Sequence, residues 1–385
     1  MRENTRVTAG VRRALLALLC CLGLLVGPVS APVFAATAIE AEHQRLGGAG
    51  GRLGAALGPE RCGLVRGGCY RSFERGSIHW SPKTGARATW GAIRGAWAAQ
   101  GYERGRLGYP VGRETCGLRD AGCYQGFEGG VMLWSRASGA HPTIGGIRAA
   151  WLREGAERGA LGYPTSGEAC GGGTCRQSFQ RGSITWTQGA GTRVHREIDR
   201  AASVYVVVNK RRALNPVDHV PRDLVSVDGQ LLRADAAAAF RRMRADAAAA
   251  EAPMTAVSGY RSYTTQAGLY RDYVARYGQA QADLISARPG HSEHQTGLAV
   301  DIGNPDGACG LQSCFAGTPA GAWARAHAHK YGFVVRYPSG RTATTGYTYE
   351  PWHLRYVGVH VATGMVTQGI PTLEHYMGLP AAPTY

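Results

Sequence analysis

The chain has 385 residues, is 44% hydrophobic and 18% charged, and carries a formal net charge of +16. Nearly all of the positive charge is arginine, which is compatible with partners such as nucleic acid or another anionic polymer. Apart from one short apolar run near its start, no segment is long and apolar enough to cross a bilayer, so the composition excludes a membrane-spanning protein.

Residues 1–38 have the order of a secretory signal peptide. Arg12 and Arg13 precede an apolar run over residues 14–26, and small residues follow it. The run is short for a membrane span. We therefore expect export by a route that the sequence does not define, followed by cleavage near residue 38. The mature protein should be secreted, associated with the cell envelope, and without a stable membrane span.

The cysteines beyond the signal form four close pairs. Close pairs in an oxidising compartment favour local disulfides. Zinc knuckles are the alternative, but each pair lacks a second pair of Cys or His at ligand spacing. We predict that four bridges pin loops: Cys62 with Cys69, Cys116 with Cys123, Cys170 with Cys175, and Cys309 with Cys314.

A repeat with a period of 54 residues begins next to the expected cleavage site. The segment LGYPVGRETCG at 107–117 recurs as LGYPTSGEACG at 161–171 and, in degenerate form, as LGAALGPERCG at 53–63. Between copies, Ile93 and Trp97 have the i, i+4 spacing of a short amphipathic helix, and the next copy repeats it. Each unit is therefore predicted to contain a helix, a glycine-rich turn, a disulfide loop, and a hairpin that carries Phe and Trp.

These units, over residues 39–193, resemble the LGFP repeat of envelope-associated bacterial proteins. Tyr109 and Tyr163 stand where that repeat usually has Phe, and Ala55 and Ala56 replace the Tyr-Pro pair in the first copy. The resemblance implies attachment to the envelope, so we expect an anionic envelope polymer as the partner of the repeats, with an array adding avidity. The alternative is that the Phe and Trp residues are only the small core of each unit.

Past residue 193 the pattern changes to an α+β domain, expected over 204–378 after a linker at 194–203 and before a tail at 379–385. Its length is enough for one good core. We predict elements from apolar periodicity and end signals. The strands are expected at 204–208, 254–258, 298–302, 333–337 and 353–357, and the helices at 228–251, 263–277 and 319–331.

The stretch PGHSEHQTGLAVDI places His294 and Asp301 around a glycine-containing turn, with Asp301 on the apolar strand that follows. Farther on, YTYEPWHLRYVG carries Glu350 and His353. A His–Asp hydrogen bond alone would explain the first stretch. Two histidines and an aspartate also supply the three protein ligands of a catalytic zinc site, and a nearby carboxylate such as Glu350 can take the proton from water.

Two details qualify this site. Pro351 disfavours helix at Glu350, and residues three apart in a regular strand point to opposite faces, so Glu350 and His353 can converge only if the strand bends or bulges there. We predict that irregularity. His291 is interpreted as a loop residue rather than a fourth ligand, because neighbouring loop positions rarely aim at one ion.

Four segments, SGYRSYTTQAGLY, ARPGHSEHQTGLAVDI, HKYGFVVRYPSG and TGYTYEPWHLRYVG, resemble the motif set of VanY-type D-alanyl-D-alanine carboxypeptidases, zinc peptidases that share a fold with lysostaphin and the hedgehog signalling domain. The match extends over about residues 204–360. It implies Zn²⁺ as cofactor and the following roles: metal ligands His294, Asp301 and His353; general base Glu350; oxyanion stabilisation by Arg261; substrate contacts Ser292, Gln266 and Tyr347.

The expected fold is therefore an α+β zinc peptidase domain with a small antiparallel sheet and flanking helices, preceded by three disulfide-pinned, β-rich LGFP-type repeats. The expected function is the removal of the terminal D-Ala from peptidoglycan stem peptides. Alternatives within the class are an L,D-carboxypeptidase, a D,D-dipeptidase and a cross-bridge endopeptidase. A cell-wall-binding protein with an inactive peptidase domain is the non-enzyme alternative, which the intact Glu350 disfavours. Secretion and disulfides disfavour a nucleic-acid partner.

Overall fold

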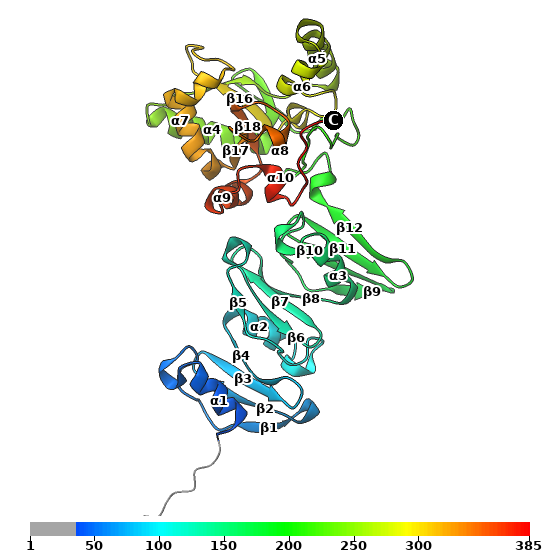
Figure 1. Ribbon diagram of the computed structural model, residues 1–385, viewed down its shortest axis with the longest axis vertical. Helices are drawn as coiled ribbons and strands as arrows, with labels where there is room; N and C mark the ends of the chain where they lie inside the picture. The colour runs from blue at the N-terminus through cyan, green and yellow to red at the C-terminus, as the bar shows by residue number, and fades with distance from the viewer. Residues whose placement is uncertain (1–35) are drawn as a thin grey trace, which may run out of the picture. The chain divides into compact units, whose positions relative to one another are not determined.

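The structure, a computed structural model, describes residues 36–385, so nearly all of the expected signal peptide lies outside the described part of the chain (Figure 1). Residues from Ala38 to Tyr385 form one unit by their contacts. Within the described residues, no helix combines the length and the apolar character needed to cross a membrane.

Three small four-stranded antiparallel sheets, each with one short helix, make up the repeats (Figure 1). Each sheet has its strands in sequence order, as a meander. The first repeat contains α1 (Ala38–Arg45), β1 (Arg61–Leu64), β2 (Gly68–Phe73), β3 (Gly76–Ser81) and β4 (Gly85–Trp90). The second contains α2 (Gly91–Ala99), β5 (Thr115–Cys116), β6 (Cys123–Phe127), β7 (Gly130–Ser135) and β8 (Gly139–Ile144). The third contains α3 (Gly145–Arg153), β9 (Ala169–Gly171), β10 (Thr174–Phe179), β11 (Gly182–Thr187) and β12 (Gly191–Arg196).

The apolar spacing of each repeat buries its aromatic side chains in a small core, and the core of the third repeat also includes Val131 and Leu133 of the second. Ile93 and Trp97 of α2 are 2% and 0% exposed, and they pack against Leu107 and Phe127 of the same repeat. The Phe that ends the second strand of each sheet is buried in all three copies. Most of the repeated aromatics are therefore needed to close each unit, which is expected where a unit of about 54 residues has little surface to bury.

All four predicted disulfides are present. In each repeat the bridge joins cysteines that face each other on adjacent antiparallel strands, so that it closes the loop between them. The fourth, between Cys309 and Cys314, closes a loop that follows the central strand of the second domain.

The tyrosine of the LGYP motif connects one repeat to the cysteine loop of the repeat before it. Tyr109 donates its hydroxyl to the carbonyl oxygen of Val65 at 2.7 Å, and Tyr163 does the same to Arg119 at 2.6 Å. Both rings are 0% exposed. A Cβ at Gly122, next to the Cys123 half-cystine, would lie 2.1 Å from the Tyr163 hydroxyl, so that only glycine leaves room for the ring.

The two end repeats each lack one half of this contact. In the first repeat, Ala55 stands at the position of the tyrosines. In the third, the bridged cysteines are 5 residues apart instead of 7, and the shortened loop is a tight hairpin turn. The repeat motif is therefore complete only in the middle copy.

The second domain is built on a four-stranded antiparallel sheet with the order β15-β16-β18-β17 and a separate two-stranded sheet, β13-β14. The strands are β13 (Leu224–Val227), β14 (Gln230–Arg233), β15 (Thr255–Ser258), β16 (Ala299–Gly303), β17 (Phe333–Tyr337) and β18 (Glu350–Tyr356). The helices are α4 (Ala234–Ala249), α5 (Tyr263–Tyr277), α6 (Gln279–Ile285), α7 (Pro319–His327), α8 (Thr342–Thr345), α9 (Val359–Thr367) and α10 (Leu373–Tyr376).

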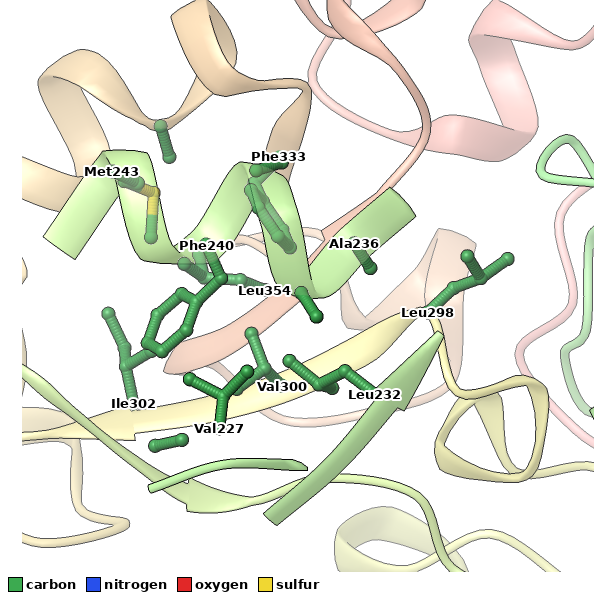
Figure 2. Packing of buried hydrophobic residues seen from close by; sticks show 14 of the residues in the cluster. Val227, Leu232, Ala236, Phe240, Met243, Leu298, Val300, Ile302, Phe333 and Leu354 are labelled. Carbon is green, nitrogen blue, oxygen red and sulfur yellow. The ribbon is translucent and has the colours of Figure 1, made fainter. Parts of the chain in front are cut away.

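One continuous core lies between α4 and the strands of this domain (Figure 2). Phe240 and Met243 of α4 are fully buried against Val300 and Ile302 of β16. Since each such side chain contributes about 1.5–3 kcal/mol by leaving water, this core fixes β16, the strand that carries Asp301.

Two predicted elements differ from the structure. The helix expected from residue 228 begins at Ala234, because Asp228 and Gly229, both with positive φ, form the two-residue turn of the β13–β14 hairpin. An Asp-Gly pair between two apolar runs favours that turn. The strand expected at 204–208 is not formed: Val206, Val207 and Val208 are buried, but the segment pairs with no strand.

Candidate functional site

Three side chains of the predicted metal site converge in the interior of the second domain. His294 lies on the short turn Glu293–Thr296, Asp301 lies in the middle of β16, and His353 lies on β18, where its Cα pairs with that of Asp301. Their ligand atoms all lie within 4.8 Å of one another, and all three side chains are buried. The fold thus brings His353 to His294 and Asp301, which lie more than 50 residues earlier in the sequence.

The outer contacts of the two imidazoles leave one nitrogen of each for a metal. His294 Nδ1 bonds the carbonyl oxygen of Gly259 at 2.7 Å, and its Nε2 faces Asp301 Oδ2 at 3.3 Å. His353 Nδ1 lies 3.0 Å from Asp301 Oδ1, and its Nε2 faces Glu293 Oε2 at 3.5 Å. Two imidazoles and one carboxylate, with outer groups that orient the rings, are a donor set that fits Zn²⁺ with an open coordination position.

The electrostatics of this group suit a cation. Burial opposes ionisation of Asp301, but the contacts with His294 and His353 outweigh it and hold the pKa of its carboxyl below the usual range. Burial lowers the pKa of His294. Burial also acts against a charge on His353, but its contacts with the carboxylates of Asp301 and Glu293 raise its pKa to about 9. A metal ion binds the ionised carboxylate and the neutral imidazoles, so that its binding would release the proton of His353.

A buried network of charges supports His353 from behind, and sequence reasoning missed it. Glu293 Oε1 accepts from Arg336 Nε and from Arg355 Nη1, each at 2.9 Å, and Arg336 also makes two hydrogen bonds with Glu374. All four side chains are 0% exposed. Burial opposes the charge of Glu293, but the two arginines and His353 keep its pKa below the usual range. The signal was Arg336 on the otherwise apolar strand β17, together with Arg355 on β18.

Glu350 approaches the ligands through the predicted irregularity. The β17–β18 ladder pairs Val335 with Leu354 but Tyr337 with Glu350, so that β18 has two extra residues between these pairs. The bulge brings Glu350 Oε2 to 3.9 Å from His353 Nδ1. The predicted bend at Pro351 is therefore confirmed, and its effect is to aim a carboxylate at the open side of the three ligands.

The pKa of Glu350 is raised to about 8, mainly by burial and in addition by the nearby negative charge of Asp301. The positive charges of His353 and Arg261 act in the opposite direction. A carboxylate in such a position holds and releases protons near neutral pH, as a general base must. A cation beside it would lower this pKa.

Arg261 enters the same cleft from the turn after β15. Its Nη2 donates to Ser258 Oγ at 3.1 Å, and its Nη1 donates to Gln266 Oε1 at 2.9 Å. Gln266, predicted to contact substrate, is 0% exposed, and its Nε2 donates to the carbonyl oxygen of Ala287 and to Ser286. In this structure its amide is fully used within the protein, where it orients the Arg261 guanidinium.

The remaining predicted residues line a cleft of 380 Å³ around the ligands. Ser292 and Tyr347 are buried residues of its wall. Leu269, Tyr273 and Tyr277 of α5, together with Leu311 of the loop closed by Cys309 and Cys314, give its outer part an apolar character. His291 lies apart from the ligands and bonds the carbonyl oxygen of Asn209 through Nδ1 at 2.8 Å. The cleft therefore joins a charged inner end to an apolar mouth, a combination suited to a peptide.

This combination of a small antiparallel sheet, a buried His-Asp-His group and an adjacent carboxylate defines a peptidase of the zinc-dependent type. Comparison with known families agrees. The family described as VanY, D-alanyl-D-alanine carboxypeptidase, matches residues 229–359, and the LGFP repeat matches residues 53–105, 107–159 and 161–200.

Individual relatives cover the second domain. The putative carboxypeptidase YodJ of Bacillus subtilis is 40% identical over 190 residues, which are 46% of this chain and 68% of that protein. A D-alanyl-D-alanine carboxypeptidase of Enterococcus faecalis is 40% identical over 129 residues, 31% of this chain and 46% of its own length. Among solved structures, the LdcB LD-carboxypeptidase is 38% identical, with a TM-score of 0.44, over 46% of this chain and 87% of the other.

The chain therefore belongs to the VanY family of D-alanyl-D-alanine carboxypeptidases, with three LGFP repeats preceding the VanY domain. The matched region contains the three residues of the predicted metal site, Glu350 and Arg261. Residues after 359, including α10 and its Glu374, lie outside it.

Proposed function

We propose that this protein removes the terminal D-Ala from peptidoglycan stem peptides that end in D-Ala-D-Ala, with Zn²⁺ as its cofactor. The observation that carries the proposal is the convergence of His294, Asp301 and His353 with Glu350 and Arg261 in one cleft. The enterococcal relatives described as D-alanyl-D-alanine carboxypeptidases support the choice of substrate.

His294 Nε2, Asp301 and His353 Nδ1 would hold the metal. When bound in such a site, zinc lowers the pKa of a water molecule to about 7 and polarises the carbonyl of the bond to be cleaved. Glu293 and Gly259 keep the two imidazoles in the orientation that presents these nitrogens. The burial of all three ligands keeps bulk water out, which strengthens every charge interaction in the cleft.

Glu350 would accept the proton of the attacking water and return it to the amine of the departing D-Ala. Its position 3.9 Å from His353 puts it within reach of a water beside the ligands. General base catalysis of this kind contributes about 10²- to 10⁴-fold to a rate.

Arg261 would stabilise the oxyanion that forms when the carbonyl is attacked. Its guanidinium is held by Ser258 and Gln266, so its charge is oriented before substrate arrives, and preorganised charge is worth more in a buried cleft than in water. Burial lowers the pKa of Arg261, but an arginine remains charged across the working range. Ser292 and Tyr347 would contact the substrate from the wall.

The same cleft would also serve an L,D-carboxypeptidase, a D,D-dipeptidase or a cross-bridge endopeptidase, because these share the metal, the base and the oxyanion partner. We further infer that residues 1–38 direct export and that the repeats hold the enzyme at an anionic polymer of the envelope. Three disulfides in the repeats are typical of an oxidising compartment and support this location.

The direct test is to incubate the mature, zinc-loaded protein with a purified muropeptide that carries a pentapeptide stem and to follow product masses. We expect the loss of one alanine, its abolition by a chelator, and a fall of about 10³-fold in kcat for Glu350→Gln at unchanged zinc content. The matched control is Glu60→Gln, the same change in the first repeat.

Loss of two alanines, or cleavage farther into the stem, would retain the chemistry but move the substrate assignment to one of the alternatives. If the protein binds zinc but cleaves no stem peptide, the chain is a wall-binding protein and the enzymatic proposal is wrong.

A further inference from the structure

A tyrosine outside the matched VanY region is built into the back of the cleft wall. Residues 380–385 run beside the segment before β18: Ala382 is 1% exposed, and its N–H donates to the carbonyl oxygen of Thr344 at 2.8 Å. This contact brings Tyr385 behind Tyr347. Tyr385 is not among the residues that line the cleft, whereas Tyr347 is.

The hydroxyl of Tyr385 joins two segments of that wall. It accepts a hydrogen bond from the backbone N–H of Arg288 at 2.7 Å and lies 3.3 Å from the hydroxyl of Tyr347. Arg288 belongs to the turn that leads to Ser292 and His294, and Tyr347 precedes Glu350. One phenol therefore links the two stretches of chain that carry the proposed substrate contacts.

The ring of Tyr385 is held as firmly as its hydroxyl. The Arg288 guanidinium lies 4.2 Å from its centroid, the His291 ring is nearly perpendicular to it with centroids 5.1 Å apart, and the Lys210 ammonium lies 5.5 Å from the same centroid. The same Lys210 is 4.8 Å from the Tyr347 ring and donates to the carbonyl oxygen of Gly346. A cation against two aromatic faces stabilises their relative position.

On its other side, Tyr347 packs against Tyr337 with ring centroids 4.5 Å apart. Tyr347 is thus clamped between Tyr337 and the group formed by Lys210 and Tyr385, and it is 4% exposed. Tyr337 and Tyr347 lie within the region that the VanY family matches, residues 229–359, whereas Lys210 and Tyr385 lie outside it.

We propose that Tyr385 is a positioning residue of the cleft: through Tyr347 and the Arg288 turn it fixes the wall on which the stem peptide rests. The role rests on the proposed function, since it concerns how that substrate is held. Tyr385 touches neither the ligands nor Glu350, so its contribution is to substrate binding and not to the chemical step. An interaction that is equally strong in the ground and transition states changes KM and leaves kcat nearly constant.

The test compares Tyr385→Phe, which keeps the ring and removes the hydroxyl, with Tyr385→Ala, which removes both. On a peptide ending in D-Ala-D-Ala we expect KM to rise about 3-fold and about 10-fold respectively, with kcat within about 2-fold of the unsubstituted protein. Zinc content and melting temperature are measured for each. Tyr124→Ala, the same change at an exposed position of the second repeat, is the matched control and should change neither constant.

A double-mutant cycle separates positioning from general stabilisation. In a Tyr347→Phe background the hydroxyl pair is already broken, so that Tyr385→Phe should raise KM by less than it does alone. Additive effects, or a lower melting temperature with an unchanged KM, would overturn the role of Tyr385. If the unsubstituted protein hydrolyses no stem peptide, the proposed function fails and this role with it, whereas hydrolysis with identical KM in all Tyr385 variants overturns the role alone.

Discussion

Two ion pairs of nearly equal length lie in very different surroundings. In the repeats, Arg66 donates to Glu128 at 2.8 Å, and the arginine side chain is 54% exposed. In the VanY domain, Arg355 donates to Glu293 at 2.9 Å, and both side chains are 0% exposed. Moving a charge pair out of water costs several kcal/mol of desolvation free energy, and the contacts of the pair must offset that cost. A surface pair loses little hydration and contributes little to the free energy of unfolding.

The difference shows in which region of the protein charged side chains are paired in the interior, at a cost in desolvation free energy. Within the described repeats, most buried polar side chains meet backbone carbonyls or hydroxyls, as Tyr163 and Trp151 do. In the VanY domain the buried charges gather behind His353. Among the described residues, the ion pairs whose two side chains are both 0% exposed therefore lie behind His353 at the predicted metal site, and the following predictions test how the two regions differ.

The largest effect is expected from Arg355→Met, which leaves Glu293 with one arginine fewer in the interior. Breaking a buried pair from one side costs about 3–5 kcal/mol of the free energy of unfolding. The control, Arg66→Met, should cost less than about 1 kcal/mol. Urea unfolding followed by circular dichroism measures both. Equal losses in the two variants would contradict the comparison.

The next effect concerns the covalent support of the repeats. Replacing Cys116 and Cys123 together by Ser should lower the free energy of unfolding by about 2 kcal/mol, because the open loop gains freedom mainly in the unfolded chain. The hydrolysis of a soluble stem peptide should remain unchanged, since this loop lies in a repeat. A parallel fall in peptide hydrolysis would show that the two regions are not independent.

A buried histidine should make the first repeat sensitive to acid. Burial, with a smaller effect of Arg94, lowers the pKa of His79 to about 3, and its ring is stacked between Tyr70 and Tyr102. Between that value and the ordinary 6.5, the unfolded chain binds a proton that the folded chain does not. Stability should therefore fall as the pH is lowered from 6.5, by about 1.3 kcal/mol between pH 7 and pH 5.5.

The control for this pH dependence is within the sequence. Leu133 occupies the position of His79 in the second repeat, so that His79→Leu is a substitution that the repeat already accepts. The variant should lose this part of the pH dependence. An unchanged difference between melting temperatures at the two pH values would exclude His79 as its source.

The smallest effect is expected at the contact between repeats. Tyr163→Phe removes one buried hydrogen bond, to Arg119, and should cost about 1 kcal/mol. Tyr124→Phe makes the same change on a side chain that is 37% exposed and should cost almost nothing. Thermal melting of both variants decides whether the LGYP tyrosine has a structural role.

Much of the fold and of the candidate site followed from the sequence because local signals agreed with the final structure. The helix expected from residue 319 begins there as α7, and Thr318 accepts from the N–H of Gly321. The bulge beside Glu350 followed from Pro351 and from the three-residue spacing to His353. In each case the deciding atoms lie within a few residues of one another.

The missed features depend on partners that are distant in the sequence. The Glu293 charge network joins four segments, and no local pattern pairs Arg336 with Glu374. The contact of Tyr163 with the Arg119 carbonyl also could not be predicted from the sequence, because a backbone acceptor has no sequence signature. The Asp228-Gly229 turn is different: its signal was present, and a strong helical pattern downstream overrode it.

The hydrogen bond between the LGYP tyrosine and the cysteine loop of the preceding repeat limits where further repeats can be added to the array. Ala55 offers no hydroxyl, and the loop between Cys170 and Cys175 is two residues shorter than the loops that accept from Tyr109 and Tyr163, so that neither end repeat has both surfaces of the middle one. Gene duplication of the middle unit would create a fourth copy that satisfies both neighbours, while duplication of either end unit would create a junction without its hydrogen bond. Growth in this lineage, or by design, should proceed from the inside.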